Sequence, residues 1–168
     1  MKATFSKLLF SALFVFALTP AFSQFSAGFN LGIPSGNWSN GYGIGFGVDG
    51  RYEAPIQDKL NWTASLGYFS FAGKTYQGFS FSSISAVPVV GGIKYYFQQS
   101  NKGFYGAADL GLYFLSASYS GANGSTTRFG FAPALGYRMD KFDFSLRYNA
   151  VTDFSYMGLR AAYIFPGK

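Results

Sequence analysis

Residues 25–33 of the chain read FSAGFNLGI, and residues 41–53 read GYGIGFGVDGRYE. In both stretches apolar side chains recur at every second position, with Ser, Gly and Asn or, toward Glu53, charged residues between them. Successive side chains of a β-strand point to opposite faces, so a period of two indicates strands, and no helical period competes with it here. Both stretches therefore predict strands with one apolar face and one face of small or charged residues.

The same alternation recurs six more times along the chain. The further strands are predicted at residues 60–68, 85–97, 104–114, 128–138, 142–149 and 158–165. Pro88 and Pro133 lie inside two of these runs, where a missing N–H interrupts the hydrogen-bond ladder, and a bulge is predicted at each. The total is eight strands.

The connections between the predicted strands alternate in length. Short, charged turns are expected at residues 54–59, 98–103 and 139–141. Longer segments rich in Gly, Ser and Asn are expected to form loops at residues 34–40, 73–83 and 116–126. Short turns at one end and longer loops at the other are typical of an antiparallel up-and-down barrel that crosses a membrane. We therefore predict an all-β, eight-stranded transmembrane barrel.

The composition indicates which face of this barrel points outward. Aromatic residues make up 21% of the chain and charged residues only 12%. If the apolar faces pointed inward, the outside would carry mostly Gly, Ser and Ala, whereas a soluble surface is about a quarter or more charged. An eight-stranded barrel also has an interior just wide enough for side chains or one small ligand. The apolar faces are therefore expected to face lipid, and a soluble ligand-binding barrel is the less favoured alternative.

The opposite faces carry a nearly balanced set of charges, five basic and four acidic. They are Asp49, Arg51, Glu53, Lys94, Asp109, Arg138, Asp143, Arg147 and Arg160. Buried charges are costly unless they are paired, so we expect a structural network of ion pairs that fills the lumen; an ion or proton path is the alternative. The five glycines at alternate positions of the first two strands, Gly28, Gly32, Gly43, Gly45 and Gly47, are expected to leave room for inward arginines such as Arg138, Arg147 and Arg160.

Aromatic residues gather toward the ends of the predicted strands, where amphipathic rings settle at headgroup depth. They are Tyr42, Tyr52, Trp62, Tyr68, Phe97, Phe104, Phe114, Phe129, Tyr137, Phe142, Tyr148 and Phe165. These residues predict aromatic belts at the two membrane interfaces.

Residues 1–23 have the features of a secretory signal peptide. Lys2 and Lys7 precede an apolar run over residues 8–18, which is too short to cross about 30 Å of hydrocarbon as a helix. Small residues before Gln24 predict cleavage there. The barrel domain is then residues 24–168, with a modest positive charge from scattered bases that does not indicate a nucleic-acid partner.

Catalytic and cofactor chemistry finds little support in the sequence. The chain contains no Cys and no His, which excludes disulfides and thiolate metal sites and removes the commonest general base. A serine nucleophile would need another base, and the pair Ser70 and Lys74 misses the Ser-x-x-Lys spacing by one residue. We expect no enzyme activity, no catalytic or metal site and no cofactor.

The last predicted strand carries a further signal, the run LRAAYIF at residues 159–165. With the signal peptide and the eight strands, it resembles the small outer-membrane β-barrel family that includes OmpX and the OmpA membrane domain, in the porin-family version common among Bacteroidetes. The resemblance implies a C-terminal assembly signal, here the alternating Leu159, Ala161, Tyr163 and Phe165, although Pro166, Gly167 and Lys168 follow the final aromatic residue. It also implies a bacterial outer-membrane location, contact with outer-membrane lipid and lipopolysaccharide, biogenesis through periplasmic chaperones and the barrel-assembly machinery, and a monomer.

The sequence thus predicts a non-enzymatic integral outer-membrane barrel with a side-chain-filled lumen. Its role would be structural in the envelope or a surface contact made through its loops. A narrow porin-like channel for small solutes is the alternative, and the soluble ligand-binding barrel is the second.

Overall fold

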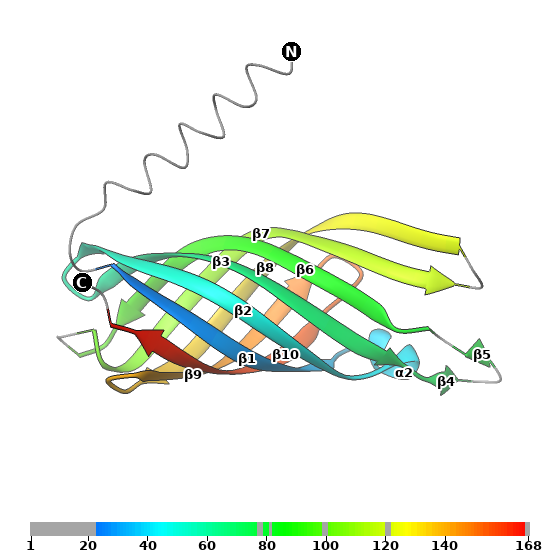
Figure 1. Ribbon diagram of the computed structural model, residues 1–168, viewed down its shortest axis with the longest axis horizontal. Helices are drawn as coiled ribbons and strands as arrows, with labels where there is room; N and C mark the ends of the chain where they lie inside the picture. The colour runs from blue at the N-terminus through cyan, green and yellow to red at the C-terminus, as the bar shows by residue number, and fades with distance from the viewer. Residues whose placement is uncertain (1–22, 77–78, 81, 99–100, 120–121, 167–168) are drawn as a thin grey trace, which may run out of the picture.

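The structure is a computed structural model that describes residues 23–76, 79–80, 82–98, 101–119 and 122–166 (Figure 1). The predicted signal peptide lies outside these residues except for Ser23. Among the residues within these ranges, no helix is long and apolar enough to span a lipid bilayer.

Eight antiparallel strands form a closed barrel in which each strand pairs with its neighbour in sequence. The barrel strands are β1 (Gln24–Pro34), β2 (Tyr42–Gln57), β3 (Leu60–Gly73), β6 (Ile84–Tyr96), β7 (Gly103–Tyr119), β8 (Ala122–Arg138), β9 (Phe142–Val151) and β10 (Tyr156–Phe165). The barrel closes where β1 pairs with β10 from Phe25 opposite Phe165 to Pro34 opposite Tyr156. The prediction of an eight-stranded up-and-down barrel is confirmed.

Three small elements lie at the end of the barrel away from the two strand termini Gln24 and Phe165 (Figure 1). They are the short helix α2 (Trp38–Gly41) and the two-residue strands β4 (Thr75–Tyr76) and β5 (Phe79–Ser80), which pair with each other. We call this the loop end of the barrel and the opposite end the turn end.

Two connections differ from the prediction. Of the expected loop at residues 116–126, residues 116–119 continue β7 and residues 122–126 belong to β8, while residues 120–121 lie outside the described part of the chain. The two strands stay paired from Ser116 opposite Ser125 to Tyr119 opposite Ala122. The expected turn at residues 54–59 shrinks to two residues because β2 continues to Gln57, with a register shift against β3 after Pro55. Backbone hydrogen bonds extend a register that the preceding apolar pairs have already set, even where the side chains are small and polar.

The predicted bulges at Pro88 and Pro133 are wrong. Pro88 lies opposite Tyr113 of β7, and Pro133 lies opposite Ala108, each in an unbroken register. On its other side each proline interrupts the ladder, with β3 and β9 respectively, but the pairs before and after the gap keep the same register. A proline lacks one N–H donor and thus loses pairing toward one neighbour, which does not require an extra residue in the strand.

The two faces of the strands are separated as the alternation predicts. Apolar side chains such as Phe46, Leu110 and Leu135 are more than half exposed on the outside. Charged side chains such as Arg51 and Asp109 are only 3% and 1% exposed. The barrel is therefore inverted relative to a water-soluble protein, with apolar side chains outside and charged groups within.

Candidate functional site

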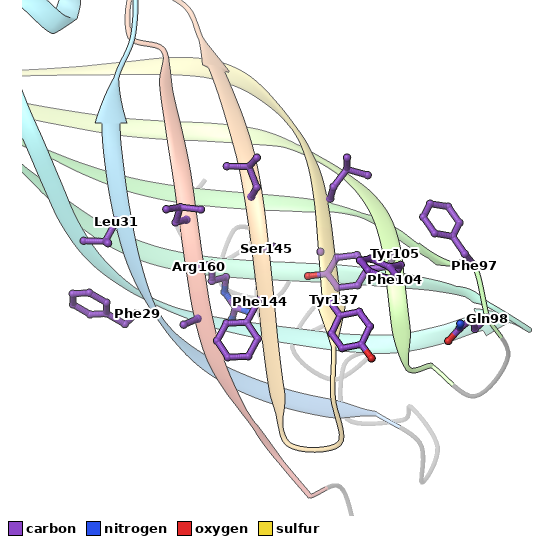
Figure 2. A pocket seen from close by; sticks show the side chains of 15 residues that line it. Phe29, Leu31, Phe97, Gln98, Phe104, Tyr105, Tyr137, Phe144, Ser145 and Arg160 are labelled. Carbon is purple, nitrogen blue, oxygen red and sulfur yellow. The ribbon is translucent and has the colours of Figure 1, made fainter.

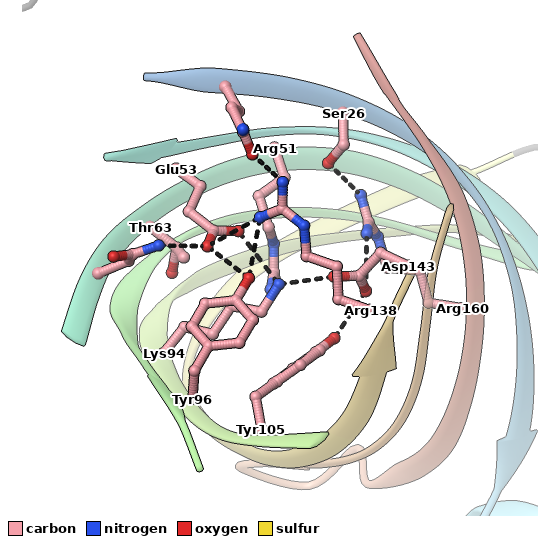
Figure 3. Close-up of polar contacts among 12 residues, drawn as sticks. Ser26, Arg51, Glu53, Thr63, Lys94, Tyr96, Tyr105, Arg138, Asp143 and Arg160 are labelled. Atoms are coloured by element: carbon pink, nitrogen blue, oxygen red, sulfur yellow. Dashed lines mark hydrogen bonds and ion pairs between the residues drawn. The ribbon is translucent and has the colours of Figure 1, made fainter. Parts of the chain in front are cut away.

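All nine charged residues predicted to point inward lie in the lumen, where each of them forms at least one ion pair. We call these nine side chains the charged tier. Figure 3 shows many of them converging from different strands inside the ring of the barrel. Residues separated by more than a hundred positions meet here, because closure of the barrel brings every strand to the same lumen.

Lys94 on β6 is held between two carboxylates. Its Nζ lies 3.1 Å from Glu53 Oε2 and 2.6 Å from Asp143 Oδ2, and it sits 3.9 Å from the centroid of the Tyr105 ring. The hydroxyl of Tyr105 donates to Asp143 Oδ1 at 2.6 Å, and that of Tyr96 donates to Glu53 Oε1 at 2.7 Å. Lys94 is only 1% exposed, and these contacts provide the pairing that a buried charge requires.

Glu53 also neutralises an arginine at the turn end of the lumen. Arg138 Nη1 lies 3.4 Å from Glu53 Oε1 and donates to the Tyr96 hydroxyl at 2.9 Å, while its Nη2 donates to the side-chain oxygen of Gln24. Asn61 donates to the same Glu53 oxygen at 2.6 Å. Glu53 thus contacts three neighbouring side chains besides Lys94, those of Asn61, Tyr96 and Arg138.

Asp109 on β7 pairs with two arginines at once. Its Oδ2 accepts from Arg51 Nη2 at 2.8 Å and lies 3.1 Å from Arg147 Nη1, while its Oδ1 accepts from the Thr63 hydroxyl at 2.9 Å. Like charges brought together in a buried site repel, so this one carboxylate is what allows the two guanidinium groups to share the lumen.

Arg160 on β10 completes the charged tier. Its Nε donates to Asp49 Oδ1 at 2.9 Å, and its Nη2 donates to the Ser26 hydroxyl at 3.1 Å. Asn30 also donates to Asp49, at 2.6 Å. A Cβ added to Gly28 would lie 2.8 Å from Arg160 Nε, so at this position glycine makes the expected room for an arginine.

The loop-end half of the lumen is filled by apolar side chains, which the alternating pattern did not predict. We call this set the apolar tier; it comprises Phe69, Phe71, Ile84, Ala86, Val90, Tyr113, Leu115, Val151, Phe154 and Tyr156. Phe71 is fully buried, with its ring centroid 5.1 Å from that of Phe154 and 5.2 Å from that of Tyr156, both in edge-to-face contact. The signal that could have revealed this tier is the run Tyr68-Phe69-Ser70-Phe71, in which aromatic residues occupy both faces of one strand.

Three of the glycines predicted to accommodate arginines accommodate phenylalanines instead. A Cβ on Gly32 would lie 2.8 Å from Phe71 Cε1, and one on Gly45 would lie 2.6 Å from the same atom. A Cβ on Gly47 would lie 2.8 Å from the Phe69 ring. The prediction was right that these glycines provide interior space, but wrong about the side chains that use it, because the apolar tier lies against this part of β1 and β2.

A cavity of about 20 Å³ lies where the two tiers meet. Asp49, Arg147 and Arg160 line it from the charged tier, and Tyr113 and Tyr156 line it from the apolar tier. Arg147 Nη2 is buried and has no hydrogen-bond partner among the described residues. A polar cavity of this size has room for about one water molecule, which is far less than an aqueous pathway needs.

The outer surface carries most of the aromatic residues predicted for the membrane borders, and at the turn end many of them contact one another. Tyr42 differs from the prediction, because it is partly buried and packs against the apolar tier. The ring centroids of Phe104 and Tyr137 are 4.8 Å apart, and those of Tyr52 and Trp62 are 5.2 Å apart. The predicted assembly signal lies on the same outer face, with Leu159, Ala161, Tyr163 and Phe165 all exposed on β10.

A shallow hollow of about 860 Å³ interrupts the apolar outer surface across β1 and β7 to β10. Figure 2 looks onto this hollow, which is lined by rings such as Phe29, Tyr137 and Phe144. Ala161 lies between Phe29 and Phe144 in the strand register, and its small side chain accounts for part of the depression. Most of the surface that lines it is apolar, so the hollow is part of the outer apolar band.

Groups that could hold a metal are absent from the part of the chain that the structure describes, since no three His, Cys, Asp or Glu side chains gather there.

Outside the strands, Lys102 forms an ion pair with Asp140 in the turn between β8 and β9. The hydrogen bond from Lys102 holds the pKa of Asp140 below its ordinary value.

No protein-family model matches the sequence, and no curated protein matches it either. Solved structures do. The barrel is similar to Ail, the attachment invasion locus protein of Yersinia pestis, with a TM-score of 0.55 and 18% identity over 85% of this chain and 97% of that one. It is also similar to Neisserial surface protein A, with a TM-score of 0.54 and 15% identity over 86% of this chain and 96% of the other. At this level of identity the similarity establishes the fold.

Proposed function

We propose that this chain is a non-enzymatic integral outer-membrane barrel whose filled lumen is a rigid support for the loops that it presents. The observation that carries the proposal is the inversion of the barrel, with apolar side chains outside and every member of the charged tier paired inside. Its role is structural in the envelope or a surface contact made at the loop end.

The outer surface supports a lipid environment. Around the barrel, side chains such as Phe29, Val48 and Leu135 expose about half or more of their area. A continuous apolar surface of this kind is a liability in water, where exposed patches larger than a few hundred Å² are rare. Closure of the barrel leaves no strand edge in its spanning part, which is the condition for a β-structure in hydrocarbon. Ail, which has a similar fold, has been solved in a phospholipid bilayer nanodisc.

The cellular setting is part of the same proposal. Residues 1–23 would direct export, and the mature barrel would be a monomer surrounded by outer-membrane lipid and lipopolysaccharide. Leu159, Ala161, Tyr163 and Phe165 form an exposed row at the end of the last strand, a position that favours recognition by the barrel-assembly machinery after delivery by periplasmic chaperones.

The filled lumen favours a support over a channel. The charged tier is crosslinked by ion pairs of 2.6 to 3.7 Å, and the apolar tier lies between it and the loop end. A porin-like path would have to break these ion pairs and displace the rings of Phe71 and Phe154. The same packing disfavours a soluble ligand-binding barrel, because the cavity between the tiers holds about one water molecule. We therefore assign the charged tier a structural role.

Three measurements test the proposal. Heat-dependent migration on a denaturing gel is expected, because a closed barrel resists detergent until it is boiled. The protein should remain in membranes after carbonate or high-salt washing and should be released by detergent; release without detergent would contradict an integral barrel. In planar bilayers we expect no stable channel, and a reproducible conductance would refute the closed lumen while leaving the membrane barrel intact.

A further inference from the structure

A second hollow, of about 310 Å³, opens at the loop end of the barrel. Two connections form its walls, the segment from Ser35 to Trp38 after β1 and the segment from Asp153 to Ser155 before β10. The Ser35 N–H donates to the Ser155 carbonyl oxygen at 2.9 Å and ties the two walls together. This hydrogen bond lies next to the pairing of β1 with β10, so the strands that close the barrel hold both walls of the hollow in place.

The hollow sits on the rim of the barrel. Tyr148, which contributes to one side, lies on the outer face of β9 and is 41% exposed. Phe154, which contributes to the other side, belongs to the apolar tier and is 1% exposed. A ligand here would lie above the edge of the strands, where solutes and the headgroups of surrounding lipids can both reach it.

Polar groups that lack strong partners face this space. Ser35 lines the hollow, but its Oγ is buried and is not itself open to a ligand. The side chain of Asn37 forms no capping hydrogen bond to α2. The Asp153 carboxylate is 72% exposed, and the ion pair found for it is a long one of 3.6 Å to Arg128, which is outside the lining. The Asn37 amide and the Asp153 carboxylate are thus available to bind a ligand that both donates and accepts hydrogen bonds.

Aromatic rings form the rest of the lining. The Trp38 ring is held by Tyr42 at 4.8 Å and by the edge of Phe154 at 5.0 Å, so its orientation is fixed before a ligand arrives. Rigid rings beside a few hydrogen-bonding groups are the usual composition of a small ligand site, and the volume is at the small end of the usual range of about 300–1,000 Å³.

The charges in the hollow decide which class of ligand it fits. Its lining contains one carboxylate, that of Asp153, and no Lys or Arg. An anionic ligand such as a phosphate or a sulfated sugar would meet this carboxylate, and the base that pairs with it, Arg128, lies outside the lining. An acyl chain would cover the polar side chains of Asn37 and Asp153 without giving them hydrogen bonds, at a cost. A neutral pyranose sugar has hydroxyl groups for the polar side chains and an apolar C–H face for an aromatic ring.

We propose that this rim hollow binds a neutral sugar ring. The inference rests on the proposed function, which places the loop end outside the cell, and it assigns a ligand class to the surface contact. The ring can belong to a free saccharide or to the headgroup of a glycolipid in the surrounding leaflet, because both present the same hydroxyl and C–H surfaces.

Tryptophan fluorescence of the folded barrel in nanodiscs tests the proposal. The chain has two Trp residues, so Trp62→Phe leaves Trp38 as the reporter. In that background, maltose, lactose and sucrose are titrated to roughly 100 mM, well above a millimolar dissociation constant. A parallel arm compares nanodiscs with and without a neutral monogalactosyl lipid. We expect a saturable change in Trp38 emission in at least one arm, and the arm that responds identifies the source of the sugar.

Matched variants separate the site from nonspecific effects. Asn37→Ala should weaken binding by about 3- to 10-fold, the loss expected for one hydrogen bond, and Tyr148→Leu should also weaken it. Asn40→Ala is the control, since Asn40 lies in the same segment and does not line the hollow. Sucrose octasulfate should not compete.

The proposal is overturned if neither arm responds, if Asn37→Ala binds as tightly as Asn40→Ala, or if the sulfated sugar binds best. A barrel that remains heat-modifiable and detergent-extracted in these experiments would keep its proposed function despite losing the sugar site.

Discussion

Replacement of Asp109 by Leu tests whether the charged tier stabilises the barrel. Asp109 is 1% exposed and is the carboxylate that faces both Arg51 and Arg147, with Oδ2 at 2.8 and 3.1 Å from their guanidinium nitrogens. The variant leaves these two cations buried together without that carboxylate. Removing one partner of a buried ion pair typically costs about 3–5 kcal/mol, and we expect a loss in the free energy of unfolding at the upper end of that range.

The assay is urea unfolding of the barrel in lipid vesicles, followed by tryptophan fluorescence and by heat-dependent gel migration. Leu110→Val is the matched control, because Leu110 is the next residue, points outward and is 54% exposed. The double variant Asp109→Leu with Arg51→Met should recover part of the loss, because it removes one stranded cation. A value for Asp109→Leu within about 1 kcal/mol of Leu110→Val, well below the range for a broken buried pair, would refute a stabilising role for the charged tier.

Three further predictions concern the outer face, the apolar tier and a surface turn. Leu110→Arg should cost about 2–4 kcal/mol in a bilayer if this position lies near the midplane, and equal unfolding free energies for Arg and Val would contradict the assigned orientation. Gly32→Ala should destabilise the barrel by about 1–3 kcal/mol through overpacking against Phe71, and Phe71→Leu should restore part of this in a double-mutant cycle. Asp140→Asn should leave the urea midpoint unchanged at neutral pH, because its ion pair with Lys102 is solvent-exposed. The ion pair lowers the pKa of Asp140, so any small contribution that it makes to the free energy of unfolding is present above the ordinary carboxyl range. That contribution is lost as the pH falls through the lowered pKa. Comparing the unfolding of the wild type and Asp140→Asn at low pH would reveal it.

Much of the barrel could be predicted from local patterns. The period of two identified the strands and their outward faces, and the inward positions of Asp49, Lys94, Asp109 and the six other charges followed from the same parity. The alternation shows which face of a strand a side chain occupies, but it does not show which side chains of other strands that residue contacts. Phe69 and Phe71 share the inward face with polar residues of β3, and nothing local to them shows that Gly32 and Gly45 lie opposite.

The hydrogen-bond ladder was less predictable than the faces. A proline interrupts one side of a strand, and whether the strand then bulges depends on the partner that it faces; at Pro88 and Pro133 the partners hold the register. The extension of β7 through Tyr119 and the early start of β8 at Ala122 depend likewise on pairing that begins at the other end of these strands, where Gly103 lies opposite Arg138.

The sequence by itself determined the class of protein, because alternation, scarcity of charge and the absence of His and Cys are properties of the chain that any three-dimensional arrangement must respect. Only the tertiary structure decided which charges pair, how the lumen divides into two tiers, and where a hollow opens on the rim. Arg51 meets Asp109 across 58 residues of sequence, and Arg160 meets Asp49 across 111. Such contacts depend on barrel closure and strand register, since a shift in register would move each inward side chain to a different partner.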